Sequence, residues 1–152
     1  MKTGILTVIF VILVTATAQA VTPISIPASG KICFGETHPR CFELKNSDYS
    51  QSTRYGVEGP IKLDLSEKAR LWKAVHDYRG WLRSEIAKRK TKPVTCSDTV
   101  KYEDDLQKED LCLDGINKKM ADTKTKTLLS ILGRPKAAAP TEKKSSAQKP
   151  KK

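Results

Sequence analysis

Four cysteines constrain the fold of this 152-residue chain more than any other feature, because they can join segments that lie far apart in the sequence. They are Cys33, Cys41, Cys96 and Cys112. An even number of cysteines in a small exported domain indicates two disulfide bonds. A zinc site is the competing interpretation, but the chain has no C-x2-C pair, and His38 and His76 are poorly placed to complete a site. The sequence therefore predicts disulfides and no metal site.

The first twenty residues have the organisation of a secretory signal peptide. Lys2 supplies the positive end, the apolar run GILTVIFVILV follows, and Ala18-Gln19-Ala20 has the small-x-small form of a cleavage site. The apolar run of eleven residues is too short to span a bilayer comfortably. No later stretch is apolar enough to be a transmembrane segment. We expect residues 1–20 to be removed and the mature protein to be secreted and extracellular.

The clearest helical pattern covers residues 64–90. Asp64 followed by Glu67 resembles a capping box at the start of a helix. The apolar positions are spaced 4, 3, 4 and 4 residues apart, which is one face of an α-helix, and they are Leu71, Val75, Tyr78, Leu82 and Ile86. Ala74 and Trp81 widen this stripe on one side, and Trp72 lies on the other. A further helix is expected to end at Gly133, shortly before Pro135.

Residues 97–113 also have the features of a helix. Ser97 or Asp98 is a suitable N-cap, and acidic residues follow early in the segment. In an unbroken helix Cys96 and Cys112 would lie roughly 24 Å apart, whereas a disulfide needs Cα atoms closer than about 7 Å. We therefore expect Cys33 and Cys41 each to pair with Cys96 or Cys112. A hairpin-like bridge between Cys33 and Cys41 is the alternative.

These patterns predict an all-α protein, because no alternating strand pattern persists. The expected domain, residues 21–132, is a small disulfide-stapled bundle of three to four helices with an irregular N-terminal arm. Residues 133–152 form a Lys/Pro/Ala-rich tail with seven basic residues against one acidic. This tail cannot bury enough apolar surface to offset its ordering cost, so we expect it to be disordered.

No motif in the chain supports catalysis. There is no G-x-S-x-G, P-loop or dinucleotide-binding fingerprint, and neither His38 nor His76 lies in a catalytic motif. An acidic cluster lacks the alternating ligands and central glycine of a calcium loop; its members are Glu103, Asp104, Asp105, Glu109, Asp110 and Asp114. We therefore expect a protein that is not an enzyme and has no cofactor. The chain also has no zinc-finger or helix-turn-helix pattern, and we expect no nucleic-acid partner.

Binding is the remaining function class. The chain has 28 lysines and arginines against 17 aspartates and glutamates. In the long helix, aromatic residues interleave with arginines, a composition that protein interfaces favour, although an ordinary amphipathic core helix explains the same pattern. The candidate partner-binding residues are Trp72, Arg79, Arg83, Lys88 and Arg89. Candidates for binding an anionic polysaccharide or lipid surface by charge alone are the tail residues Lys143, Lys144, Lys149, Lys151 and Lys152.

The stretch CFGETHPRCF and the Trp-bearing helix that follows it carry a resemblance to a known group. With the signal peptide, four cysteines and basic body, the chain resembles the small helical salivary proteins of blood-feeding insects, of the anophensin/albicin type of anopheline mosquitoes. The resemblance implies a helical protein that inhibits a host plasma cascade, either the alternative complement pathway or the contact system of coagulation. Albicin-like members act by binding an assembled convertase. No functional residue carries over, because no motif matches residue by residue.

The expected function is thus that of a secreted, non-enzymatic complement inhibitor or anticoagulant that binds a host plasma protein or protein complex. A carrier of small hydrophobic ligands is an alternative, which requires an internal cavity above roughly 300 Å³. A polyanion-binding or membrane-binding defence protein is a further alternative, suggested by the net charge of the chain.

Overall fold

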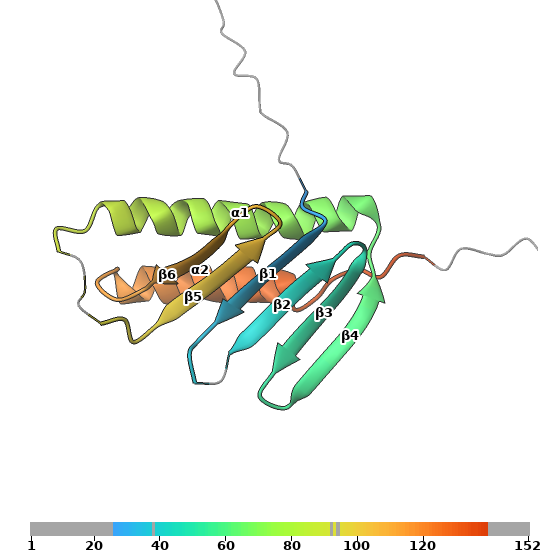
Figure 1. Cartoon of the computed structure of the whole chain (residues 1–152), viewed down its shortest axis with the longest axis horizontal. Helices are drawn as coiled ribbons and strands as arrows, with labels where there is room; N and C mark the ends of the chain where they lie inside the picture. Colours follow the sequence, from blue (N-terminus) through green and yellow to red (C-terminus); the bar gives the residue numbers. More distant parts are fainter. Residues whose placement is uncertain (1–25, 38, 92, 94, 140–152) are drawn as a thin grey trace, which may run out of the picture.

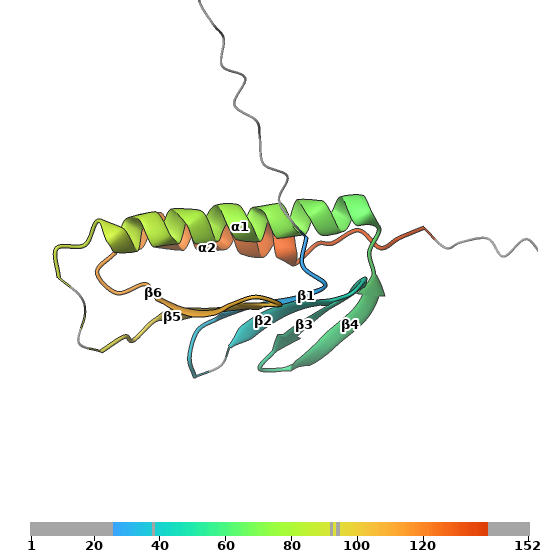
Figure 2. The same ribbon diagram turned by 45° about the horizontal axis from the view of Figure 1, so that its top comes forward.

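The computed structural model describes residues 26–37, 39–91, 93 and 95–139. It shows a six-stranded antiparallel sheet with two helices on one face (Figures 1 and 2). The strands are β1 (Ser29–Phe34), β2 (Arg40–Lys45), β3 (Asp48–Thr53), β4 (Gly56–Lys62), β5 (Thr99–Asp104) and β6 (Lys108–Cys112). The helices are α1 (Leu65–Ala87) and α2 (Lys118–Leu132). The prediction of an all-α bundle is therefore wrong.

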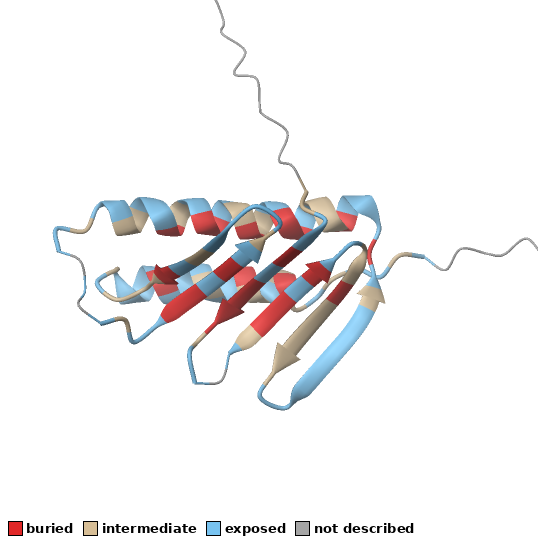
Figure 3. Ribbon diagram, in the orientation of Figure 1, coloured by how far each residue is buried: buried red, intermediate tan, exposed pale blue. Residues whose placement is uncertain are grey.

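The sheet has the strand order β4-β3-β2-β1-β5-β6, so β5 and β6 add to the free edge of β1 after the chain has passed through α1. Each strand is five to seven residues long. In β1, Ile32 and Phe34 face the helices. In β5, Val100 and Tyr102 face the helices, whereas Lys101 and Glu103, which alternate with them, are exposed. This alternation places one face of each strand in the core. Figure 3 shows the resulting buried positions along the central strands and the exposed β4 at one edge.

The helix predicted over residues 97–113 is instead the β5–β6 hairpin. Its acidic residues satisfy turn and backbone groups: Asp104 accepts the N–H groups of Leu106 and Gln107 in the turn. Asp105 accepts the backbone N–H groups of Ala28 and Ser29, where β1 begins. Acids that resemble the first turn of a helix thus organise a hairpin tip and hold the neighbouring strand.

Both disulfides are local. Cys33 pairs with Cys41, with Cα atoms 4.1 Å apart, and Cys96 pairs with Cys112, with Cα atoms 5.8 Å apart. The expected pairing of Cys33 and Cys41 with Cys96 and Cys112 is wrong, because it depended on a helix that does not form. The alternative bridge between Cys33 and Cys41 is confirmed: these residues lie directly opposite each other in the β1–β2 register.

Helix α1 confirms the prediction made for residues 64–90. Asp64 is its N-cap and accepts the backbone N–H of Glu67 at 2.7 Å. The apolar stripe packs on the sheet, and Trp72 widens it: the Trp72 side chain is only 4% exposed and lies against Gly30 of β1. Most of the core lies between α1, α2 and the sheet, and includes Ile32, Phe42, Leu44, Leu71, Val75, Leu82, Tyr102, Leu128 and Leu132.

The chain beyond α2 runs back along the domain. The backbone N–H of Lys136 donates to Glu67 at 2.9 Å, and that of Ala138 donates to the carbonyl of Lys62 at 2.7 Å. The described part of the expected tail, residues 134–139, therefore lies beside the end of β4 and the start of α1. The rest of that tail, residues 140–152, lies outside the described residues, as do the expected signal peptide and the start of the N-terminal arm.

The contact between Gly30 and Trp72 predicts how stability changes when a methyl group is added at residue 30. A Cβ at residue 30 would lie 2.0 Å from the Trp72 ring, which the surrounding core holds in place. Gly30→Ala should lower the free energy of unfolding by roughly 1–3 kcal/mol, as overpacking does. Gly80→Ala is the control, because nothing lies within 4 Å of its Cβ position; it should raise stability by about 0.5–1 kcal/mol. Urea unfolding of both variants measures the difference, and equal values would contradict the packing described.

The disulfide connectivity predicts the products of a tryptic digest made without reduction. Cleavage after Arg40 separates Cys33 from Cys41, and cleavage after Lys101 separates Cys96 from Cys112. Mass spectrometry should find fragment 32–40 joined only to fragment 41–45, and the Cys96 fragment joined only to the Cys112 fragment. A linked pair that contains Cys33 or Cys41 together with Cys96 or Cys112 would contradict the structure.

Candidate binding surface

Charge is divided unevenly between the two layers of the protein. We call residues 65–91 and 118–139 the helical layer, and the other described residues the sheet layer. The helical layer holds 14 lysines and arginines against 4 aspartates and glutamates, whereas the sheet layer holds 7 against 12. The protein is therefore strongly dipolar, and an acidic macromolecule is attracted to the side that carries the helices.

On the face of the sheet away from the helices, charges of opposite sign lie side by side on neighbouring strands. The register across β2, β1, β5 and β6 places Glu43, Lys31, Glu103 and Lys108 in one row of alternating sign. Lys31 lies 3.9 Å from Glu43, and Lys108 lies 3.5 Å from Glu103. Opposite charges on neighbouring strands stabilise a solvated sheet face. The four charges of this row therefore cancel one another, although the sheet layer as a whole is acidic.

Arg79 and Arg83 bind α1 to the β5–β6 hairpin. The Arg79 side chain is only 5% exposed; its Nε donates to Glu109 at 2.6 Å, and its guanidinium lies 4.1 Å from the centre of the Tyr102 ring. Arg83, which is half exposed, donates to the other oxygen of Glu109. Burial acts to raise the pKa of Glu109, but the hydrogen bonds and charges of the two arginines lower it below its usual value. Both arginines therefore have a structural role, because they join α1 to the β5–β6 hairpin.

The other predicted partner-binding residues lie in different surroundings. Trp72 is buried on Gly30, Arg89 donates to the backbone carbonyl of Cys112, and Lys88 pairs with Glu85 at 2.7 Å. Of the predicted set, Arg83 on α1 and Lys88, the C-cap of α1, are exposed, whereas Trp72 and Arg79 are inaccessible. The tail lysines Lys143, Lys144, Lys149, Lys151 and Lys152 lie outside the described residues.

His76 has a structural position beside the core. Its ring meets the edge of the Trp72 ring at a centroid distance of 5.9 Å. Burial lowers the pKa of His76, and the nearby Arg79 charge lowers it further. No described cysteine, serine or threonine is hydrogen-bonded to it. Cys96, Cys112 and Asp114 lie close enough together to suggest metal ligands, but both sulfur atoms are already bonded in the disulfide.

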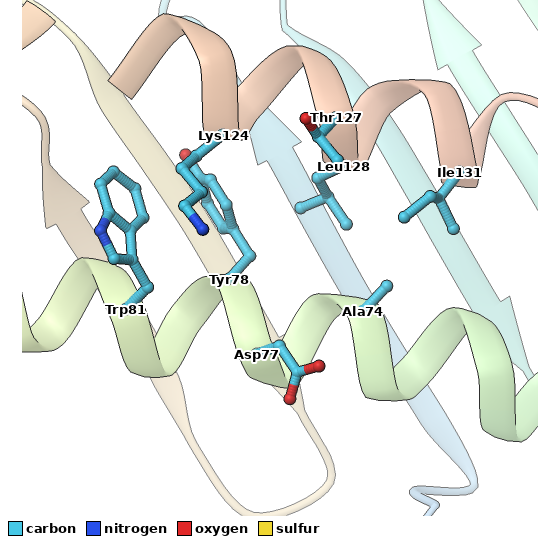
Figure 4. A pocket seen from close by; sticks show the side chains of 8 residues that line it. All are labelled: Ala74, Asp77, Tyr78, Trp81, Lys124, Thr127, Leu128 and Ile131. Atoms are coloured by element: carbon cyan, nitrogen blue, oxygen red, sulfur yellow. The ribbon is translucent and has the colours of Figure 1, made fainter. Parts of the chain in front are cut away.

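A groove runs between α1 and α2 on the side away from the sheet (Figure 4). Its volume is about 230 Å³. Tyr78 and Leu128 are buried and form the floor, while Trp81 and Ile131 are half-buried along the walls. The remaining lining residues are Ala74, Asp77, Lys124 and Thr127. The groove is therefore an apolar depression within the basic helical layer.

The sequence contained a partial signal for this groove. Ala74 and Trp81 were recognisable as flanking the α1 stripe, but Trp72 on the opposite flank looked equally suitable for an interface. Only the positions of the sheet and α2 separate the two: the sheet covers Trp72, whereas Trp81 lines the groove between the helices. Trp81 is the functional candidate that sequence reasoning missed.

The space between the sheet and the helices is well filled. The cavity lined by Gly30, Ile32, Phe42, Trp72 and other core residues has a volume of about 10 Å³. A cavity of this size holds at most about one water molecule. The region therefore lacks room for the small hydrophobic ligand that a carrier would enclose there.

Glu67, in the first turn of α1, holds the chain segment that follows α2. Its buried carboxylate accepts two hydrogen bonds from Arg70, at 2.8 and 2.6 Å, and one from the backbone N–H of Lys136. The hydrogen bonds from Arg70 and from the Lys136 N–H together lower the pKa of Glu67 to about 2, although burial opposes them. The carboxylate thus holds the described end of the chain against α1.

Comparison of the chain with protein-family models, with curated proteins and with solved structures finds no match. Among the described residues, no helix has both the length and the apolar character needed to cross a membrane. The two disulfides are compatible with an extracellular protein.

Glu67 predicts how stability depends on pH. Because its folded-state pKa of about 2 lies below the usual 4.5, it stabilises the fold above pH 4.5 and loses this effect as the pH falls toward 2. Glu67→Gln should lower the free energy of unfolding by about 1–3 kcal/mol near neutral pH and flatten the loss of stability in acid. Asp77→Asn, which removes an exposed ion pair with Lys73, should change stability by less than about 1 kcal/mol. Denaturant unfolding at several pH values tests this, and parallel profiles for the wild type and Glu67→Gln would contradict it.

Proposed function

We propose that the protein is a non-enzymatic binding protein that contacts an acidic protein partner through its helical layer. The observation that carries the proposal is the position of the apolar groove between α1 and α2, within a layer that holds 14 basic residues against 4 acidic. Protein interfaces combine an apolar centre with a polar rim, and complementary charge accelerates their formation.

Much of the positive charge in the helical layer is available to a partner. Arg79, Arg83 and Arg89 are engaged with the β5–β6 hairpin and the residues that follow it. By contrast, several exposed basic residues have no carboxylate partner among the described residues. These are Lys90, Lys118, Lys119, Lys124, Lys126, Arg134 and Lys136. Of these, Lys124 lines the groove, and the others lie elsewhere in the helical layer.

For the partner, we propose a host plasma protein complex of the complement or contact system. The support is the expected signal peptide and the compatibility of two disulfides with the extracellular medium. The resemblance noted in the sequence implies the same kind of target, although the helical fold that it also implies is wrong. An anionic polysaccharide or lipid surface would also be attracted to the basic layer, but neither explains an apolar groove at its centre.

The proposal predicts inhibition that depends on the helical layer. The mature protein should inhibit complement-mediated haemolysis or contact-activated clotting at micromolar concentration or below. The triple variant Lys119→Glu, Lys124→Glu and Lys126→Glu should raise the half-inhibitory concentration by roughly tenfold or more, because the reversed charges repel an acidic partner.

The matched control is Lys45→Glu, Arg54→Glu and Lys101→Glu, which makes the same change of net charge at exposed positions of the sheet layer. It should change the half-inhibitory concentration by less than about threefold, because exposed charges on the far side are screened over about 10 Å. Absence of inhibition in both assays contradicts the plasma-complex proposal, and an equal loss in both triple variants contradicts the assignment of the surface.

A further inference from the structure

The walls of the α1–α2 groove have the spacing of a helix-binding surface. On α1 the lining residues Ala74, Tyr78 and Trp81 follow one another at intervals of four and three residues. On α2 the residues Lys124, Leu128 and Ile131 have the same intervals. Each wall therefore extends over two helical turns, roughly 10 Å. A third helix with apolar side chains at i, i+4 and i+7 presents them over this same length.

The chemistry of the walls favours a helix over an extended segment. An extended peptide gains affinity by pairing its backbone with the edge of a sheet. The groove is formed by the sides of two α-helices, whose mid-helix N–H and C=O groups are already hydrogen-bonded within each helix. It therefore offers side-chain contacts alone, with Tyr78 and Leu128 as a buried floor and Trp81 and Ile131 as walls. A helix satisfies its own backbone and needs only such contacts.

The charges at the mouth of the groove define the polar residues of that helix. Lys124 extends from α2 across the groove toward Tyr78 and Trp81 (Figure 4). On the opposite wall, Asp77 is already paired with Lys73 at 2.6 Å. The excess charge at the mouth is thus positive, and Lys124 carries it. Carboxylates beside the apolar stripe of a bound helix would complement it.

We propose that the groove between α1 and α2 binds an amphipathic acidic helix of the partner protein, with apolar side chains at i, i+4 and i+7 in the groove and flanking carboxylates near Lys124. This inference rests on the proposed function and names the part of the partner that makes the contact. Apolar anchors set the dissociation rate of such a complex, while the positive charge of the helical layer raises the association rate.

The test uses a fluorescent helical peptide with leucines at i, i+4 and i+7 and glutamates beside them. Binding to the full mature chain is followed by fluorescence anisotropy. Ala74→Phe fills the groove, and Lys124→Glu reverses the charge at its mouth. Their matched controls are Ala87→Phe, at an exposed position outside the groove on α1, and Lys101→Glu, at an exposed position of the sheet layer. Circular dichroism and unfolding midpoints establish that each variant is folded.

The wild type should bind the peptide, and Ala74→Phe and Lys124→Glu should each weaken binding by roughly tenfold or more, as loss of an interface anchor does. Ala87→Phe and Lys101→Glu should change it by less than about threefold. A peptide with lysine in place of glutamate should not bind, and neither should one in which the same residues are scrambled around the helix.

Two results would overturn the inference in distinguishable ways. Equal binding of the ordered and scrambled acidic peptides, with sensitivity only to the triple lysine variant, would leave the proposed function intact and remove the groove as a helix site. Binding of laurate, blocked by Ala74→Phe, without binding of any peptide would assign the groove to a single-chain lipid and would count against both proposals.

Discussion

The burial of one broad face of α1 on the sheet is the interaction on which the rest of the structure depends. Trp72, Val75 and Leu82 on this face meet β1 and its neighbours, and each is no more than 4% exposed. Burying a side chain of this size contributes about 1.5–3 kcal/mol. Gly30 makes the contact possible, because only a residue without a side chain lets the Trp72 ring approach β1 so closely. The orientation of α1 then determines where α2 packs and where the groove opens.

The buried Arg79 determines how the second half of the sheet joins this core. Its side chain is held between Glu109 of β6 and the Tyr102 ring of β5, which places α1 over strands that follow it in the sequence. A buried ion pair adds little net stability, because desolvation offsets most of the attraction, yet removal of one partner is costly. The main effect of the contacts of Arg79 is therefore to hold α1 over β5 and β6.

The elements that could be predicted from sequence are those determined by local patterns. The capping by Asp64 and the stripe on α1 need only the residues of the helix itself, and the existence of disulfides needs only the cysteines and the signal of export. The strands were not recognisable, because each has five to seven residues and shows too few alternations. The acidic start of the segment 97–113 resembled the first turn of a helix, although Asp104 and Asp105 stabilise a hairpin tip. The wrong disulfide pairing followed from that misassigned segment. The wrong fold class followed from it together with the four unrecognised strands of residues 29–62.

The same long-range dependence explains why the candidate surface differs from the one expected. In sequence, the arginines of α1 are the most conspicuous basic residues, but the acidic β5–β6 hairpin lies beside α1 and takes up Arg79 and Arg83 through Glu109. The carboxylates of the hairpin stabilise its turn and hold the start of β1. Through Glu109, the hairpin also neutralises two of the basic charges of α1. Helix α2 has four lysines and one acidic residue, Asp122. None of these five residues forms an ion pair within the described part of the chain. The charge left for an acidic partner is therefore concentrated on α2, where the groove also lies, and not on the Trp-bearing helix that the sequence pattern favours.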